Sequence, residues 1–481
     1  MVGRCRCPPP PPPPGLRRVT RSQSRVDRIS ALPDDLLLQV LTRLRCARTA
    51  ARTSLLARRW RKVWPGLLEV SFRGLAPDAI HAALARFTRT LLTAIDIHVS
   101  MGTGHGALDA GSVTDLLHAS ADRSPVKFAL TIPVDLRRFD FTTWVELPRF
   151  DFATSIELDV QNVHFALSAA TEFPALETLS LAGCIMDMAT LVPRCPLLRA
   201  LSVTRTPDEV DTITVHSESL QELVVSTFRS TSTIDIVAPA LRKLTMAMDR
   251  GIDNSLSVVA PMVEEVTWRC LYYSTYIGIG KMWRVGSLKV RAVEKMELTD
   301  DAAAEEEGSH QPRRAHVLSL DILDTPYPSQ RDFAEELEKI PVPTFSVLEL
   351  KIATRSHVLG PLLLNLLRIC NAVQRLDMVL VDTPVQVTES CDKRCPCQEN
   401  NRKWRKIGAS ERLLIDLTEV QIKGFKGDDE EIHFLKLLFR CAPMLQTMTL
   451  KLSDGVTDDW YNIFLDTVQE YPYVNSSVCI G

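Results

Sequence analysis

The sequence predicts an α/β protein, in which a short helical unit near the amino end precedes a solenoid of repeated strands. Two observations predict this fold. Residues 32–44, LPDDLLLQVLTRL, place leucine and valine at helical spacing. From residue 176 onward, an L-x-x-L-x-L pattern returns every 21 or 22 residues. Stacked copies of such a pattern form a curved parallel sheet with helical or irregular return segments, and we expect a disordered N-terminal tail before them.

Residues 1–27 form this proline- and arginine-rich tail, with an unbroken proline run from Pro8 to Pro14. Polyproline favours an extended left-handed helix, and the flanking arginine and serine residues cannot build a core. We therefore expect a solvated tail, with recognition by a proline-binding domain as the alternative. The tail has no apolar region of a secretory signal, and the chain has no apolar run long enough for a membrane span. These features predict a protein of the nucleus and/or cytoplasm whose 12 cysteines are mostly free thiols.

Charge is segregated along the chain. Residues 1–65 contain 15 Lys and Arg against 3 Asp and Glu, a net charge of +12. Because the whole chain has a net charge of −3, the remainder carries −15. Such asymmetry suggests that the two regions face different partners.

Residues 28–72 are predicted to form a compact helical unit. Pro33 suits a first helical turn, and Asp34 and Asp35 complement the positive end of the helix dipole. A second helix is predicted from Thr49 to Trp64, and Pro65 follows it directly. The first helix has one apolar stripe, made of Leu36, Leu37, Val40, Leu41 and Leu44, and the second has another, made of Leu56, Trp60, Val63 and Trp64.

The repeats are predicted to occupy residues 90–390. Five clear copies begin at Leu176, Leu198, Leu220, Leu241 and Val263. Weaker copies begin at Ile156, Phe345, Val373, Leu417 and Leu445. This period is typical of leucine-rich repeats, in which each strand buries its apolar side against its neighbours. An acidic, alanine-rich segment at about 297–314 has no apolar periodicity and is predicted to be a disordered insertion.

The run RISALPDDLLLQVLTRLRCARTAARTSLLARRWRKVWPGLLEVSF at residues 28–72 resembles an F-box. With the repeats, the chain is similar to plant F-box, leucine-rich-repeat and FBD proteins. An FBD-like terminal region is expected over residues 391–465, and its most specific part begins with LTEVQIKGFKGDDEEIHFLKLLF at Leu417. In that part Gly424 and Gly427 are predicted to flank a turn, and Asp428 with Glu431 predicts a capping-box start of a helix.

The resemblance implies a substrate-recognition subunit of a Skp–cullin–F-box type E3 ubiquitin ligase, without catalytic activity, cofactor or metal. The F-box would dock on a Skp-type adaptor, which links it to a cullin–RING ligase, and the repeats would bind a target protein of unknown identity. The first helix is expected to be the main contact, whereas Trp60 fits interface and internal core equally well. The matched adaptor-binding residues are Leu32, Pro33, Leu36, Leu37, Val40, Leu41, Leu44, Leu56, Trp60 and Trp64.

Three alternatives compete with this interpretation. The second helix is strongly basic, so the unit could be a DNA-binding helix-turn-helix. The glycine-rich segment GTGHGA at residues 102–107 partly matches a dinucleotide-binding turn, although no acidic strand end follows at the right spacing. Cys391, Cys395 and Cys397 could bind zinc, although their spacing is irregular and no histidine is near.

Overall fold

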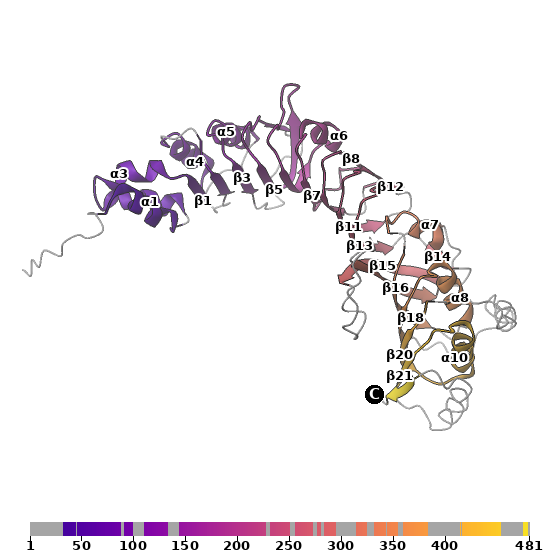
Figure 1. Cartoon of the computed structure of the whole chain (residues 1–481). Helices are drawn as coiled ribbons and strands as arrows, with labels where there is room; N and C mark the ends of the chain where they lie inside the picture. The colour runs from indigo at the N-terminus through magenta and orange to yellow at the C-terminus, as the bar shows by residue number, and fades with distance from the viewer. Residues whose placement is uncertain are drawn as a thin grey trace, which may run out of the picture. The chain divides into compact units, whose positions relative to one another are not determined.

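The structure is a computed structural model, and the chain divides into two compact units, Met1–Leu67 and Leu68–Gly481 (Figure 1). The acidic segment 297–313, the GTGHGA segment, Cys391, Cys395 and Cys397 lie outside the described residues. The proline-rich tail does as well. Among the described helices, none has the length and apolar character that crossing a membrane requires. The structure describes residues 32–44, 46–87, 91–99, 110–132, 144–227, 231–250, 255–272, 277–279, 283–294, 314–324, 331–342, 344–354, 359–382, 414, 416–453 and 475–479.

The first unit is helical. Its first helix, α1, spans Asp34–Thr42, as the apolar spacing predicts, with Asp34 and Asp35 in its first turn. The single second helix that we predicted is wrong, because the structure has shorter pieces. They are α2 (Ala47–Arg52), the 3₁₀ turn η1 (Thr53–Leu55), α3 (Trp60–Val63) and the 3₁₀ turn η2 (Trp64–Gly66).

The break in the second helix has a local cause. The Thr53 hydroxyl donates a hydrogen bond of 2.6 Å to the Ala50 carbonyl, and the Leu56 amide donates to the Thr53 carbonyl. Threonine hydroxyls that bond to nearby carbonyls compete with the regular helical ladder, and the three-residue spacing tightens the turn. Residues after Thr53 therefore leave the α-helical path until Trp60.

In the part that the structure describes, the second unit has a 19-stranded sheet in which most strands pair in chain order, and Figure 1 shows its helices along one side. The first part pairs β1 (Glu69–Leu75), β2 (Ala94–Val99), β3 (Lys127–Ile132), β5 (Ser155–Leu167), β6 (Thr178–Ile185), β7 (Ala200–Thr204), β9 (Glu222–Thr227), β11 (Lys243–Arg250) and β13 (Glu265–Tyr272), all in parallel. Residues 69–72, which we grouped with the helical unit, therefore belong to this sheet, since they pair with β2.

The repeat registers confirm the predicted leucine-rich repeats. Leu179, Leu201, Leu223, Leu244 and Val266 lie in register across β6, β7, β9, β11 and β13. Each occupies the fourth position of its repeat, and each is at most 2% exposed. A one-residue slip would turn these side chains out of the core, so burial fixes the register.

The weaker repeats continue the same ladder toward the carboxyl end. In parallel order these strands are β16 (Arg314–Asp324), β18 (Val347–Thr354), β19 (Arg375–Asp382), β20 (Glu419–Phe425), β21 (Thr447–Leu452) and β22 (Asn475–Cys479). Leu348, Leu376, Val420 and Met448 are again in register and fully buried. Repeats that are faint in the sequence are therefore structurally equivalent to the clear ones.

One strand runs against the others. β15 (Trp283–Glu294) is antiparallel to β13 on one side and to β16 on the other. Three short strands complete the sheet: β4 (Trp144–Leu147) beside β5, β14 (Ile277–Ile279) beside β15, and β17 (Arg331–Asp332) beside β14.

Return segments differ along the array. Helical ones are α4 (Pro77–Leu84), α5 (Ala110–Ala121), α6 (Met188–Leu191) with the 3₁₀ turn η3 (Val192–Arg194), α7 (Phe333–Leu337), α8 (Gly360–Ile369) and α10 (Asp429–Cys441). Three others form strands, which we did not predict: β8 (Thr212–His216), β10 (Thr233–Val237) and β12 (Ser255–Val259) make a second parallel sheet. Ile213, Ile234 and Leu256 are in register there and buried.

The start of α10 is capped by Asp428 and Glu431 in a capping-box-like arrangement, as predicted, with Glu431 reaching the amides that precede the N-cap. The Glu431 amide donates to Asp428 Oδ1 at 2.8 Å. Glu431 Oε2 accepts hydrogen bonds of 2.8 Å from the Lys426 and Gly427 amides. The predicted role of Gly424 in this turn is wrong, because Gly424 lies inside β20.

We expect Glu431 to make the second unit less stable as pH rises. Burial raises the pKa of the Glu431 carboxyl from 4.5 to about 7, and Asp428 acts in the same direction. The folded protein then holds this proton more tightly than the unfolded chain. The resulting stabilisation is fully present below pH 4.5 and is lost as pH rises to about 7, on the order of 3 kcal/mol in total.

The measurement is the free energy of unfolding in urea at pH 5 and pH 8, for the wild type and Glu431→Gln. The glutamine oxygen can still accept both amides, but the side chain does not titrate. We expect the variant to remove most of the wild-type difference between the two pH values. The same pH dependence in both proteins would contradict this assignment.

Candidate functional site

The apolar stripe of α1 divides into two rows in the structure. Leu37 and Leu41 are 0% and 1% exposed and belong to the core of the helical unit. Leu36, Val40 and Leu44 are 42%, 42% and 41% exposed. They follow at intervals of four residues, so they lie on one side of the helix and its last turn. We call Leu36, Val40 and Leu44 the exposed row.

The other predicted adaptor-binding residues also divide. Trp60 and Trp64 are 4% and 5% exposed, so they are internal core. Leu32 is half-buried and Pro33 is exposed. Both precede the exposed row in the sequence. Leu56 is 75% exposed, in the irregular stretch between η1 and α3. Only some of the predicted adaptor-binding residues are therefore accessible to a partner.

An ion pair fixes the start of α1 against the segment before α3. Arg59 Nη2 lies 2.6 Å from Asp34 Oδ1, and Arg59 Nε donates to the same oxygen at 2.8 Å. Both side chains are well exposed, so the pair contributes little to stability. Its effect is geometric, because it ties the two helices whose packing turns the exposed row outward.

The exposed row can bind an apolar surface. Burying the exposed parts of three such side chains would contribute about 2–4 kcal/mol, on the scale of 1.5–3 kcal/mol for a fully buried side chain. This is enough to anchor an interface but not to form one alone. The helix-turn-helix alternative loses support, because the predicted basic recognition helix is broken at Thr53 and Arg59 is paired with Asp34.

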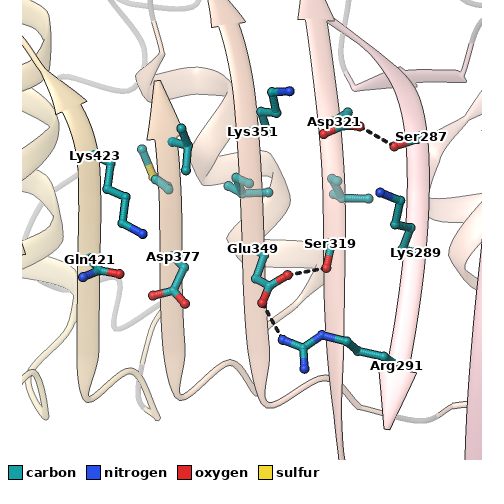
Figure 2. A pocket seen from close by; sticks show the side chains of 14 residues that line it. Ser287, Lys289, Arg291, Ser319, Asp321, Glu349, Lys351, Asp377, Gln421 and Lys423 are labelled. Carbon is teal, nitrogen blue, oxygen red and sulfur yellow. Dashed lines mark hydrogen bonds and ion pairs between the residues drawn. The ribbon is translucent and has the colours of Figure 1, made fainter. Parts of the chain in front are cut away.

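A second candidate site lies on the helix-free face of the large sheet, across β15, β16, β18, β19 and β20 (Figure 2). It is an open groove with a volume of about 470 Å³. Sequence analysis did not locate it, because the residues come from strands far apart in the chain. The side chains lining it include Ser287, Lys289, Arg291, Ser319, Asp321, Glu349, Lys351, Asp377, Val379, Gln421 and Lys423.

The acidic side chains of this groove have partners. Glu349 accepts hydrogen bonds from Arg291 at 2.7 Å and from Ser319 at 2.5 Å (Figure 2). Although burial alone would raise the pKa of Glu349, these hydrogen bonds and the Arg291 charge hold it below its ordinary value. Asp321 accepts from Ser287 at 2.6 Å, and Asp377 pairs with Arg375 at 3.1 Å, outside the lining.

Neither unit offers a metal centre in the part that the structure describes, where His, Cys, Asp and Glu do not gather in groups of three or more. Described cysteines, such as Cys184, Cys195 and Cys370, are free thiols. Burial raises the pKa of each of these three thiols to about 12, which keeps them protonated and unreactive.

The sequence is similar to those of known proteins. A family profile described as FBD-associated F-box protein At5g56370, LRR repeats, matches residues 117–262. Over 187 residues the chain is 28% identical to F-box/LRR-repeat protein 25 of Arabidopsis thaliana, covering 37% of this chain and 67% of that protein. It is 28% identical over 218 residues to FBD-associated F-box protein At5g56370, covering 41% and 49%. It is 26% identical over 270 residues to Putative F-box/FBD/LRR-repeat protein At3g49030, covering 52% and 59%; both relatives are from the same plant. The alignments thus span about half to two thirds of these relatives.

The ladder of buried leucines defines a leucine-rich-repeat protein, and a helical unit with an exposed apolar row precedes the repeats in the chain. Its sequence is also similar to several proteins of one plant. The chain is similar to plant proteins of the F-box, leucine-rich-repeat and FBD type. Such family members suggest, in general terms, a substrate-adaptor role in ubiquitin ligases.

Proposed function

We propose that this protein is the substrate-recognition subunit of a Skp–cullin–F-box type ubiquitin ligase in the nucleus or cytoplasm. Its helical unit docks on a Skp-type adaptor through the exposed row, and its sheet binds the target protein. The observation that carries the proposal is that Leu36, Val40 and Leu44 are solvent-exposed on the helix whose other row is fully buried. A small helical unit has little core of its own, so three exposed apolar side chains on one helix fit a docking surface better than a chance arrangement.

The proposed mechanism is proximity. The protein forms no covalent intermediate and moves no proton. It holds a target beside a ubiquitin-charged enzyme and raises the local concentration of the lysines of the target. Binding at the two sites must therefore be simultaneous, and loss of either one abolishes transfer.

We expect the Leu36→Asp and Val40→Asp double variant to lose adaptor binding. Aspartate in a desolvated apolar interface costs about 1–3 kcal/mol per group, so affinity should fall about a hundredfold. The measurement is co-purification of a plant Skp-type adaptor with the full chain, followed by titration. Because both positions are exposed, the helical unit should keep its fold, which circular dichroism would check.

Leu197→Asp is the matched control, since Leu197 is 53% exposed but belongs to the repeat unit. It should bind the adaptor as the wild type does. Unchanged adaptor binding in the double variant would refute the proposed docking surface. Retention of duplex DNA by the wild type at moderate salt, without adaptor binding, would favour the helix-turn-helix alternative.

A further inference from the structure

The helix-free face of the sheet changes character along the array. On β6 to β11 the middle of this face has small, uncharged side chains, such as Ser180, Ser202, Thr204, Ser226, Thr245 and Ala247, whereas charged residues (Glu222, Lys243 and Asp249) lie nearer the strand ends. From β13 onward, the row of Ala247 continues with the charged residues Arg269, Lys289, Glu349 and Asp377, and the next row contains Asp321, Lys351 and Lys423. The groove of Figure 2 lies in this charged part, so it is a local feature of the chain and not a property of every repeat.

Within the charged part, the acids and the lysines differ in their partners. Glu349 pairs with Arg291, and Asp377 pairs with Arg375, which lies outside the lining. Asp321 accepts a hydrogen bond from Ser287. By contrast, no hydrogen bond or ion pair joins the exposed Lys289, Lys351 or Lys423 to another described residue. Free positive charge therefore remains on the groove after its acids have been paired.

Positive side chains also stand next to one another at both borders of the groove. Arg269 on β13 lies directly opposite Lys289 on β15. Lys423 on β20 lies in register with Lys451 on β21. All four are exposed. Like charges in register on neighbouring strands repel and destabilise a sheet, so this arrangement fits a surface that meets negative charge from outside.

An apolar strip adjoins the cationic groove. A second open cavity of about 470 Å³ shares Ser287, Asp321 and Lys351 with it. Its other walls include the half-buried side chains of Leu271, Leu323 and Val381. A ligand that covers both cavities would meet lysines on one part and aliphatic side chains on the next.

We propose that this surface, from β13 to β21, binds an acidic segment of the target protein, in which Asp or Glu residues stand beside aliphatic ones. The carboxylates would meet Lys289, Lys351 and Lys423, and the aliphatic side chains would lie on the Leu323 and Val381 strip. This inference rests on the proposed function, because it names the chemistry of the target that the repeats recruit. Charge complementarity makes a basic segment a poor ligand.

The test uses the full chain and a short fluorescein-labelled peptide in which glutamates alternate with serine and leucine. Anisotropy titration should show binding that weakens steeply as salt rises, since the contacts are exposed charges. A peptide with lysine in place of glutamate should not bind. Equal binding of both peptides, or tighter binding of a single-stranded RNA of similar net charge, would overturn the proposal.

The variant combines Lys289→Gln, Lys351→Gln and Lys423→Gln. We expect it to bind the acidic peptide at least about tenfold more weakly. Its melting temperature should stay equal or rise slightly, because repulsion with Arg269 and Lys451 is removed. The matched control is Lys127→Gln, which removes one exposed lysine from β3, at the start of the same sheet, and should leave peptide binding unchanged.

Adaptor binding separates the two proposals. The triple variant should co-purify with the adaptor as the wild type does. If the wild type binds the acidic peptide but no adaptor, the proposed function fails and the groove assignment stands. If the adaptor binds but the triple variant holds the peptide as tightly as the wild type, the groove assignment fails alone.

Discussion

Replacing Leu37 with alanine is expected to unfold the helical unit while leaving the repeats intact. Leu37 is 0% exposed, and α1 packs on α3 and η2. Truncation of a buried leucine to alanine costs about 2–5 kcal/mol, because transfer free energy is lost and a cavity remains. The described part of this unit, residues 32–67, is too small to hold much more stability than that.

Hydrogen exchange on the full chain measures this effect by region. Peptides that cover α1 to η2 should lose protection in Leu37→Ala, whereas peptides that cover β6 to β11 should not change. Leu36→Ala is the control, since it makes the same substitution one position earlier at a 42% exposed site. We expect it to change stability by less than about 0.5 kcal/mol. Equal loss of protection in both variants would show that the two rows of α1 are not distinct.

Replacing Gly424 with alanine is expected to disrupt the carboxyl-terminal strands. Gly424 has a φ of +77°, and a Cβ at this position would lie 2.3 Å from the Leu380 carbonyl oxygen on β19. The ladder between β20 and β21 shifts register between Lys423 and Phe425, so Gly424 is the bulged residue. Left-handed backbone costs an alanine about 1–2 kcal/mol, and the backbone overlap adds about 1–3 kcal/mol.

The measurement is the urea unfolding midpoint, with limited proteolysis to locate the disrupted segment in β19 to β21. Gly286→Ala on β15 is the control. A Cβ there would lie 3.1 Å from a terminal methyl group of Leu323, which can move aside, and Gly286 has no positive φ. We expect the control to lower stability much less. A Gly424→Ala protein as stable as the control would mean that β20 does not follow this path.

The array of strands was predictable because its cause is local. Each repeat buries leucine, valine or methionine at its fourth position, so the same spacing occurs wherever a strand joins the ladder. Even the faint copies at Phe345, Val373, Leu417 and Leu445 led to the correct register. The capping box at Asp428 was also predictable, since both partners lie within one turn of chain.

Return segments were less predictable. The strands β8, β10 and β12 do carry alternating apolar residues, such as Ile213 with Val215 and Ile234 with Ile236. Each is only five residues long, and a segment of that length shows no period that separates a strand from an irregular turn. Pairing with the neighbouring repeat decides the matter, because the backbone amides of one return segment find their acceptors in the next.

Sequence alone determined where the apolar stripe of α1 lies and that leucines recur at a fixed period, because both depend on spacing along the chain. Tertiary structure decided which row of that stripe is buried, since Leu36 and Leu37 differ only in what packs against them. It also decided which charges meet on the sheet. Lys289, Lys351 and Lys423 come together only because β15, β18 and β20 are alternate strands in one run of five paired strands, an arrangement that backbone pairing sets and sequence separation does not.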